Sequence, residues 1–451
     1  EEEAFGQVPI DVLGPYCCMD AEVTYRLTGA LLEELEADKA LEKLFFNLYM
    51  PLSAAYTTAE LYGVKIDVPY VKKLAVEYTQ QEKDLLAEVY KLVGKEFNLN
   101  SYKQMGNVLY EILKFPIINL TKTGAPSTDE GTLKEMPQDH EHYHILDKIL
   151  TYRGVAKMLS TYILPMLEHK DNYDRVHPSF LLHGTVSGRL SSKGPNIQNI
   201  PRDPRVKGMF IATKGYTFVE MDYSQAELRV MAYYSGDRVM TQQYRNNEDI
   251  HLSTASTIFH KPQEEITKQE RKYAKLTNFG AMYGGSPNRL MQSINEKLNP
   301  EDRKVTIAEA EKFRAGFFSL YTGIERFIEQ VHAIIWKKKE IVNIFGRRRR
   351  LPQIDSPHTE KQAEALREGL NALIQGTASD LTQLSVVRIV KFLKEQKLKT
   401  RFLFTVHDAI IFEVPDAELK FLPYIKKSME VQVPPLDFPL IADCELFPER
   451  W

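Results

Sequence analysis

Two aspartates, Asp222 and Asp408, stand where apolar runs typical of strands end or turn. Residues 218–221 precede the first, and the runs 401–406 and 409–414 flank the second as the arms of a hairpin flank its turn. Taken alone, each aspartate is better explained as a helix N-cap or a turn residue. As a pair at strand ends they could hold two Mg²⁺ ions about 4 Å apart, the arrangement that serves in-line phosphoryl transfer.

Four residues recur at steps of four: Arg271, Lys275, Phe279 and Tyr283. On an α-helix each such step drifts by only about 40°, so the four form one slanting stripe from two cations to two aromatic rings. Cations on the phosphates and a ring against the sugar and base would match a nucleoside triphosphate laid along this face. The alternative is an amphipathic helix whose aromatics join the core, but such a stripe rarely carries two cations in register.

Glycine-rich phosphate-binding loops of the two common types do not occur in the sequence, so phosphates must be held by side chains and metals. The three cysteines, Cys17, Cys18 and Cys444, lack C-x-x-C spacing and support neither a disulfide framework nor a zinc site. Isolated thiols in a reducing compartment explain them better.

Length and composition are those of a large globular chain: 451 residues, 43% hydrophobic and 26% charged, for which several domains are expected. No apolar run approaches the roughly 18 residues that span a bilayer, and no apolar signal core follows the acidic first residues. The net charge of −3 argues against a generally basic nucleic-acid coat protein. Residues 337–350, with seven basic residues against Glu340 alone, could line a channel for a polyanion, the alternative being a solvated charge run.

The elements that must position these residues are helices mixed with short strands. Apolar residues at helical spacing predict helices over 16–46, about 68–93 and most of 250–340. Segments dense in Gly, Pro, Ser, Asn or Thr predict loops over 114–138 and 185–204. The mixture predicts an α+β fold with helical lobes attached to a sheet.

These segments resemble the motifs of the family A DNA polymerases, and the chain is similar to their large, Klenow-type fragment. Asp222-Tyr-Ser-Gln-Ala-Glu-Leu-Arg229 resembles the first polymerase motif, Arg271 to Gly284 the second and Val406-His-Asp408 the third. Further matches are Gly63-Val-Lys-Ile-Asp67, Ser187-Gly-Arg-Leu-Ser-Ser192 with Pro195-Asn-Ile-Gln-Asn-Ile-Pro201, Asp249-Ile-His251 and Gln375-Gly-Thr-Ala378. They follow the family order and cover nearly the whole chain.

The resemblance implies a right-hand polymerase architecture of palm, fingers and thumb, with a residual C-terminal piece of a 3′–5′ exonuclease domain. The implied limits are 1–30 for the exonuclease remnant, 31–62 for a connection and the start of the palm, 63–165 for the thumb, 166–228 for the palm, 229–339 for the fingers and 340–451 for the C-terminal part of the palm.

The resemblance also implies template-directed, DNA-dependent DNA synthesis with two Mg²⁺ ions. Asp222 and Asp408 would be the catalytic metal ligands, with the Tyr223 carbonyl as a backbone ligand. The implied dNTP-binding residues are Arg271, Lys275, Phe279, Tyr283, His251, Gln225 and Glu227. Among them Glu227, with Tyr283, would form the steric gate that leaves no room for a 2′-hydroxyl.

The DNA-binding residues that the resemblance implies are Arg189, Asn371, Gln375 and His407 at the primer terminus or minor groove, Arg367 on the template side and Lys157 on duplex phosphates from the thumb. The expected partners are primer-template DNA and dNTPs, with no membrane and a monomeric state. Roles in DNA replication and repair and a cytoplasmic, nucleoid-associated location follow from the resemblance, while organellar or viral origin stays open.

Two features depart from the family pattern. Ala409 stands where the third motif usually carries glutamate after His-Asp, which bears on metal affinity or rate. Tyr16-Cys-Cys-Met-Asp20 resembles the last exonuclease motif, but the other carboxylates of that site are absent from the sequence. The expectation is polymerase activity without proofreading.

Two alternatives remain open. A single-subunit, phage-type RNA polymerase shares the palm carboxylates and a similar fingers helix, but Glu227 argues against it because that enzyme admits the 2′-hydroxyl. A catalytically impaired DNA-binding scaffold is favoured only by Ala409, whereas both aspartates and all four stripe residues are intact.

Overall fold

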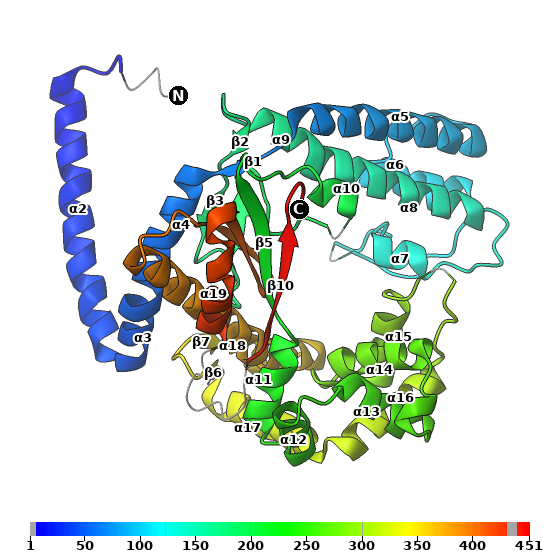
Figure 1. The fold of residues 1–451 in the computed structure, drawn as a ribbon. Coiled ribbons are helices and arrows are strands. Elements are labelled where there is room, and N and C mark those ends of the chain that lie inside the picture. The colour runs from blue at the N-terminus through cyan, green and yellow to red at the C-terminus, as the bar shows by residue number, and fades with distance from the viewer. Residues whose placement is uncertain (1–5, 122, 202, 300, 431–439) are drawn as a thin grey trace.

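A central antiparallel sheet of four strands separates two helical regions in the computed structural model (Figure 1). The structure describes residues 6–121, 123–201, 203–299, 301–430 and 440–451. The strand order is β10-β5-β9-β8. The strands are β5 (Tyr216–Tyr223), β8 (Arg401–Val406), β9 (Ala409–Pro415) and β10 (Ala442–Phe447).

Both faces of this sheet are covered, which explains its nearly continuous apolar strands. Val219 and Met221 of β5 lie in one hydrophobic core, whereas Phe218 lies in a second core on the opposite face. Because side chains alternate along a strand, Asp222 shares the face of Phe218. The predicted strand at 218–222 and the predicted hairpin at 400–414 are confirmed.

The upper helical region in Figure 1 is an elongated lobe with its own core, built mainly from α5 and α8. Helix α5 (Val68–Val93) begins at the N-cap Asp67 and ends at the left-handed Gly94, so the helix predicted over 68–93 is confirmed. Helix α8 spans Tyr143–Lys157. The other elements between residues 64 and 207 are α6 (Tyr102–Gly106), α7 (Glu130–Lys134), α9 (Leu164–Glu168), α10 (Pro204–Lys207), the π-helical turns η2 (Asn107–Ile112) and η3 (Met158–Ile163), and the short strands β1 (Val64–Lys65), β2 (Arg175–Val176), β3 (Ser179–Leu181) and β4 (Ser191–Lys193).

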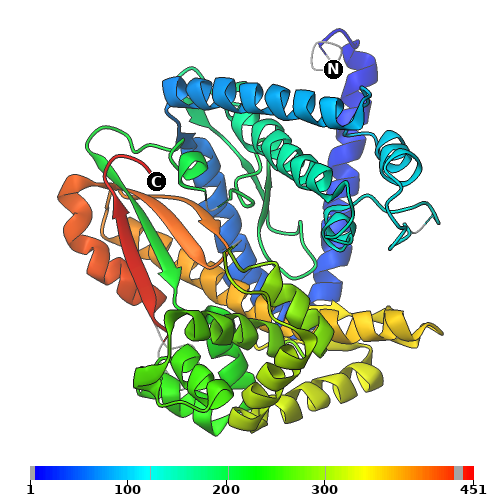
Figure 2. The same cartoon turned by 90° about the vertical axis from the view of Figure 1, so that its right-hand side faces the viewer.

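The lower region is almost entirely helical and faces the sheet from the opposite end (Figure 2). Its elements are α11 (Ala226–Ser235), α12 (Arg238–Arg245), α13 (Ile250–Phe259), η4 (Gln263–Glu265), α14 (Lys268–Ala281), α15 (Pro287–Asn295), α16 (Ile307–Leu320) and α17 (Thr322–Lys338). The mainly helical prediction for 250–340 is therefore confirmed.

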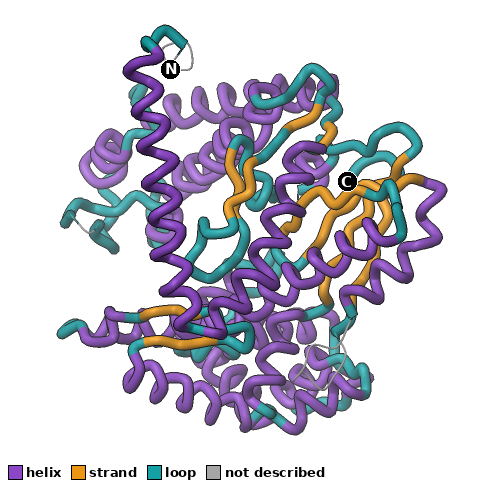
Figure 3. Tube along the Cα trace, turned by 90° about the vertical axis from the view of Figure 1, so that its left-hand side faces the viewer, coloured by secondary structure: helices purple, strands orange, loops and turns teal. Residues whose placement is uncertain are grey.

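One long helix, α18 (Thr359–Glu395), packs against α4, α11, α17 and α19 and so joins the sheet to the lower region. The remaining elements are α2 (Ile10–Ala37), α3 (Lys39–Leu44), η1 (Phe45–Tyr49), α4 (Met50–Tyr62), β6 (Glu340–Val342), β7 (Arg348–Arg350), η5 (Pro352–Asp355), η6 (Asp416–Phe421) and α19 (Leu422–Met429). Helix α2 runs along one side of the molecule and buries none of its residues (Figure 3). No helix in the described part of the chain is long and apolar enough to cross a membrane.

The structure corrects three details of the sequence-based predictions. The segments predicted as loops contain regular structure, since α7 lies within 114–138 and β4 within 185–204. The helix expected over 16–46 is interrupted at Asp38, which ends α2 and caps α3 with its carboxylate. Tyr283 was expected on the same helix as Arg271, but α14 ends at Ala281 and Tyr283 lies in the turn that follows.

The predicted domain limit at 62/63 coincides with the end of α4 and the limit at 339/340 with the start of β6, whereas those at 30/31, 165/166 and 228/229 fall inside α2, α9 and α11. The division into domains stays a prediction.

Candidate active site

Strand pairing places Asp222 and Asp408 side by side at one end of the sheet. Asp222 of β5 is the direct partner of Ala409, the first residue of β9. Val406 pairs with the same Ala409, so His407 and Asp408 form a two-residue turn, with His407 in the left-handed conformation at φ 55°. Since directly opposed Cα atoms lie about 5 Å apart, Asp408 adjoins the residue that faces Asp222.

Ala409, which lies directly opposite Asp222, has a methyl group at the position where the resemblance predicts a carboxylate. On the other side of β5, Asp443 of β10 is the direct partner of Asp222. Within the described residues, no group of three or more His, Cys, Asp or Glu side chains is arranged to hold a metal ion. The predicted donors, the carboxylates of Asp222 and Asp408 and a main-chain oxygen, are hard ligands of the kind that suit Mg²⁺.

Tyr223 anchors the end of β5 that carries Asp222. Its hydroxyl lies 2.6 Å from both the Ser385 hydroxyl of α18 and the Met429 carbonyl of α19. Burial raises the pKa of Tyr223 to about 12, so the phenol stays protonated and keeps its donor. A buried hydroxyl bonded in this way fixes the backbone beside the aspartate.

Helix α14 presents the cationic half of the stripe to the outside. A capping box between Thr267 and Glu270 starts the helix. Arg271 and Lys275 are exposed, whereas the opposite face is buried in a core that includes Tyr273. The sequence-based expectation of a one-sided helix therefore holds for these two residues.

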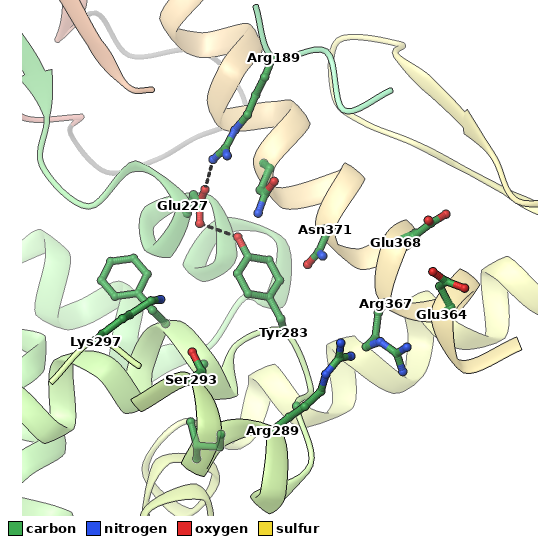
Figure 4. A pocket seen from close by; sticks show the side chains of 15 residues that line it. Arg189, Glu227, Tyr283, Arg289, Ser293, Lys297, Glu364, Arg367, Glu368 and Asn371 are labelled. Atoms are coloured by element: carbon green, nitrogen blue, oxygen red, sulfur yellow. Dashed lines mark hydrogen bonds and ion pairs between the residues drawn. The ribbon is translucent and has the colours of Figure 1, made fainter. Parts of the chain in front are cut away.

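The aromatic half of the stripe meets the region that follows β5. Tyr283 donates a hydrogen bond to Oε2 of Glu227 at 2.5 Å, and Nη2 of Arg189 lies 2.6 Å from Oε1 (Figure 4). Burial, together with the adjacent Glu227 charge, raises the pKa of Tyr283 well above its ordinary value. Because Glu227 lies on the first turn of α11, only five residues after Asp222, this network links the stripe to the carboxylate pair.

A cavity of about 580 Å³ opens beside this network. Figure 4 shows Arg189, Glu227 and Tyr283 on one side and Arg367 and Asn371 of α18 on another. The predicted site residues that line it are Arg189, Glu227, Phe279, Tyr283, Arg367, Asn371 and Gln375. Oδ1 of Asn371 is buried and has no hydrogen-bond partner among the described residues, which leaves an acceptor for a ligand.

A second cavity, of about 230 Å³, adjoins the hairpin turn of the sheet. Arg189 and His407 both line it, so Arg189 belongs to both cavities. The structure thus brings residues from widely separated segments of the chain to one continuous region between the sheet and α14.

Other predicted residues lie outside the two cavities. Gln225 is in the left-handed conformation before α11, and its Oε1 accepts a hydrogen bond from Tyr244 at 3.0 Å. His251 is buried on α13, where its Nδ1 lies 2.9 Å from Nδ2 of Asn278. Lys157 is the exposed last residue of α8 in the upper lobe.

The first cavity also contains cations that the sequence-based prediction missed. Arg289 and Lys297 reach it from α15 and from the turn after that helix. Ser286-Pro287 is a sequence signal for the start of a helix, and Ser286 is the N-cap of α15. That signal predicts a helix, but it does not show that Arg289 reaches the cavity, because this depends on how α15 packs on α14.

Comparisons with known proteins place this geometry in a family. The family model for DNA polymerase family A matches residues 68–451. The chain belongs to this family. DNA polymerase I of Chloroflexus aurantiacus is 35% identical over 427 residues, which cover 92% of this chain and 44% of that protein. The thermostable DNA polymerase I of Thermus aquaticus is 36% identical over 427 residues, covering 93% of this chain and 50% of that protein.

A solved structure gives the same result for the fold. The POL domain of Pol1 from M. smegmatis, in complex with DNA primer-template and dNTP, matches with a TM-score of 0.85 and 29% identity. The match covers 94% of this chain and 74% of that chain. The family A resemblance and the α+β fold are confirmed, whereas the exonuclease remnant over residues 1–30 stays a prediction. The chain spans about half the length of the two DNA polymerase I proteins, from Chloroflexus aurantiacus and Thermus aquaticus.

Proposed function

We propose that this family A chain is a template-directed, DNA-dependent DNA polymerase that adds dNTPs to a primer 3′-hydroxyl. The observation that carries the proposal is the linkage of two half-sites. Asp222 and Asp408 adjoin at the end of the sheet, and the Tyr283–Glu227 contact ties the α14 stripe to the same strand-to-helix segment. A phosphoryl-transfer centre needs both an anionic metal site and a cationic phosphate site.

Asp222, Asp408 and the Tyr223 carbonyl would hold two Mg²⁺ ions. When bound, the ions favour the ionised 3′-hydroxyl and neutralise charge on the departing pyrophosphate. The hydroxyl oxygen bonds to the α-phosphorus as the bond to the β-phosphate oxygen breaks. Family A polymerases are generally divalent-metal dependent, and the two-ion arrangement is the proposal.

The substrate lies along α14. Arg271 and Lys275 bind the triphosphate, with His251 and Gln225 nearby, and Phe279 packs on the deoxyribose. Glu227 is held from both sides by Tyr283 and Arg189, so it cannot swing away from the sugar. A ribonucleotide then meets both a clash and an unpaired polar group.

The same proposal assigns the DNA contacts. Arg189 and His407 would contact the primer terminus, which is supported by Arg189 lining both cavities and His407 lining the second. Asn371 and Gln375 read the minor groove of the new base pair, and Arg367 contacts the template. Lys157 holds duplex phosphates from the upper lobe. The predicted palm, fingers and thumb limits and a monomeric enzyme belong to this proposal.

Primer extension tests the function directly. With Mg²⁺ and a primed DNA template, the chain is expected to incorporate the complementary dNTP, to reject NTPs, and to lose about 10³-fold or more of the rate in Asp222→Asn. Preferential incorporation of NTPs would indicate an RNA polymerase instead. DNA binding without extension would indicate a scaffold.

Ala409 is tested by restoring the carboxylate. Ala409→Glu is expected to shift the Mg²⁺ dependence of extension to lower concentration, because a third carboxylate in the row adds negative charge beside Asp222. The rate of extension by the wild type and by Ala409→Glu is measured across a Mg²⁺ titration at saturating dNTP. An unchanged titration would show that this position does not tune metal use.

A further inference from the structure

An ion pair joins the start of α13 to the first residue of the α14 stripe. Asp249 is the N-cap of α13, where its Oδ1 accepts hydrogen bonds from the backbone N–H groups of His251 at 2.9 Å and Leu252 at 3.1 Å. Its Oδ2 accepts from Nε of Arg271 at 2.8 Å and lies 2.7 Å from Nη2 of the same guanidinium. The Asp249 carboxylate thus caps α13 and also binds the exposed guanidinium of Arg271.

Both oxygens of Asp249 are occupied, so the carboxylate cannot turn away without uncapping α13. Burial alone would raise the pKa of Asp249, but the hydrogen bonds from Arg271 and the backbone hold it below its ordinary value. The carboxylate therefore stays ionised at neutral pH. A guanidinium held along one edge by a fixed anion has less rotational freedom than one on a free side chain.

The opposite edge of the Arg271 guanidinium remains for another anion. Among the described residues its Nη1 has no hydrogen-bond or ion-pair partner. The side chain is 44% exposed, so an incoming phosphate can reach it. The arrangement matches a bidentate group whose inner side is fixed by protein and whose outer side is open.

A second contact between α13 and α14 orients the ring of His251. Asn278 is fully buried and its amide Nδ2 lies 2.9 Å from Nδ1 of His251. An amide nitrogen can only donate, so Nδ1 accepts and Nε2 carries the ring proton. Burial lowers the pKa of His251 to about 4, and the ring is neutral at neutral pH. Arg271 and His251 are thus both oriented by contacts across the packing of α13 on α14 (Figure 1).

We propose that Asp249 is a positioning residue for dNTP binding, which it favours by holding the Arg271 guanidinium ready for the triphosphate. The inference rests on the proposed polymerase function and deepens it. Asp249 does not touch the substrate, since its two oxygens face the α13 backbone and Arg271. Its negative charge is neutralised by Arg271 before the triphosphate arrives.

The test is Asp249→Asn, which keeps a good N-cap oxygen but removes the charged acceptor of Arg271. The matched control is Asp67→Asn, because Asp67 also caps a helix, α5, and also pairs with an arginine, Arg450, far from α14. In single-nucleotide incorporation, Asp249→Asn is expected to raise the KM for dNTP about tenfold with kcat within about twofold, and Asp67→Asn to leave both unchanged. Asp249→Ser, which also retains a capping oxygen, is expected to give the same split.

A double-mutant cycle separates positioning from a structural role. In an Arg271→Ala background, adding Asp249→Asn is expected to change the KM by less than about twofold, because the residue through which Asp249 acts is gone. An unchanged or lowered KM in Asp249→Asn alone, or an equal rise in both backgrounds, would overturn the inference. A wild-type chain that incorporates no nucleotide would instead overturn the proposed function on which the inference rests.

Discussion

Two cation-rich segments of this chain have opposite environments. The arginines of residues 347–350 border a short hairpin and mostly face carboxylates of the protein itself, whereas Arg271 and Lys275 of α14 face outward. Arg347 pairs with the fully buried Asp380, with Nη2–Oδ1 at 2.5 Å and Nε–Oδ2 at 3.1 Å. Arg348 and Arg349 likewise have intramolecular acidic partners.

The comparison shows that positive charge in a sequence does not by itself mark a binding surface. The basic run was interpreted as a possible polyanion channel, yet the structure uses at least three of its four arginines to join elements distant in sequence. Lys275, by contrast, has no hydrogen-bond or ion-pair partner among the described residues. An exposed cation without an internal partner keeps its charge available for a ligand.

Breaking the Arg347–Asp380 pair is expected to have the largest effect. Arg347→Ala leaves a fully buried carboxylate without its cation and should lower the free energy of unfolding by about 3–5 kcal/mol. Arg349→Ala is the control, since its pair with Glu368 is partly exposed and should contribute below about 1 kcal/mol. Denaturant unfolding measures both. Equal effects of the two substitutions would contradict the distinction between buried and exposed pairs.

A change of pH sharpens the contrast on the α14 side. Burial lowers the pKa of His251 from its ordinary 6.5 to about 4, so between these values the unfolded chain binds the proton more readily. The contribution of His251 to stability is therefore fully present above about pH 6.5 and is lost as the pH falls to about 4. The loss should approach about 3 kcal/mol at the acid end.

The measurement is the free energy of unfolding of the wild type and His251→Gln between pH 4 and 7. The difference between the two proteins is expected to shrink as the pH falls. A difference that stays constant with pH would show that His251 is not held neutral by burial.

Lys275→Ala is expected to have the smallest of these effects when each is expressed as a free energy. It should change the kinetics with dNTP and leave the stability of the fold unchanged. It should lower kcat/KM for dNTP about 10–100-fold, as expected for loss of one charged hydrogen bond, with an unchanged melting temperature. Lys272→Ala is the control on the same helix, because Lys272 already pairs with Asp302. A melting temperature that falls as far in Lys275→Ala as in Lys272→Ala would remove the distinction between the two lysines.

Sequence patterns correctly predicted those features of the fold that depend on residues close together in the chain. The alternation of apolar residues around His407-Asp408 predicted the hairpin, and the spacing of Arg271 and Lys275 predicted the exposed face of α14. These features depend on residues a few positions apart, which is why periodicity and turn chemistry reveal them.

Long-range partners could not be predicted in the same way. Arg347 contacts Tyr49, which lies 298 positions away, and Glu227 receives both Arg189 and Tyr283 from other segments. Nothing in the local sequence shows that Asp249 faces Arg271 or that Asp443 lies opposite Asp222. The resemblance to the family supplied candidate residues, but the contacts that orient them depend on tertiary packing.

In the proposed function, Asp222 and Asp408 form the catalytic pair of a DNA polymerase. Single-turnover incorporation of the template-specified dNTP in Mg²⁺ is measured for the wild type, Asp408→Ala and the control Glu445→Gln. Glu445 is an exposed carboxylate of β10, two residues after Asp443 and on the same face of the sheet. We expect the wild type and Glu445→Gln to incorporate the nucleotide, and a folded Asp408→Ala to lose at least about 10³-fold of the rate. Metal-dependent incorporation that survives in Asp408→Ala would contradict this proposal.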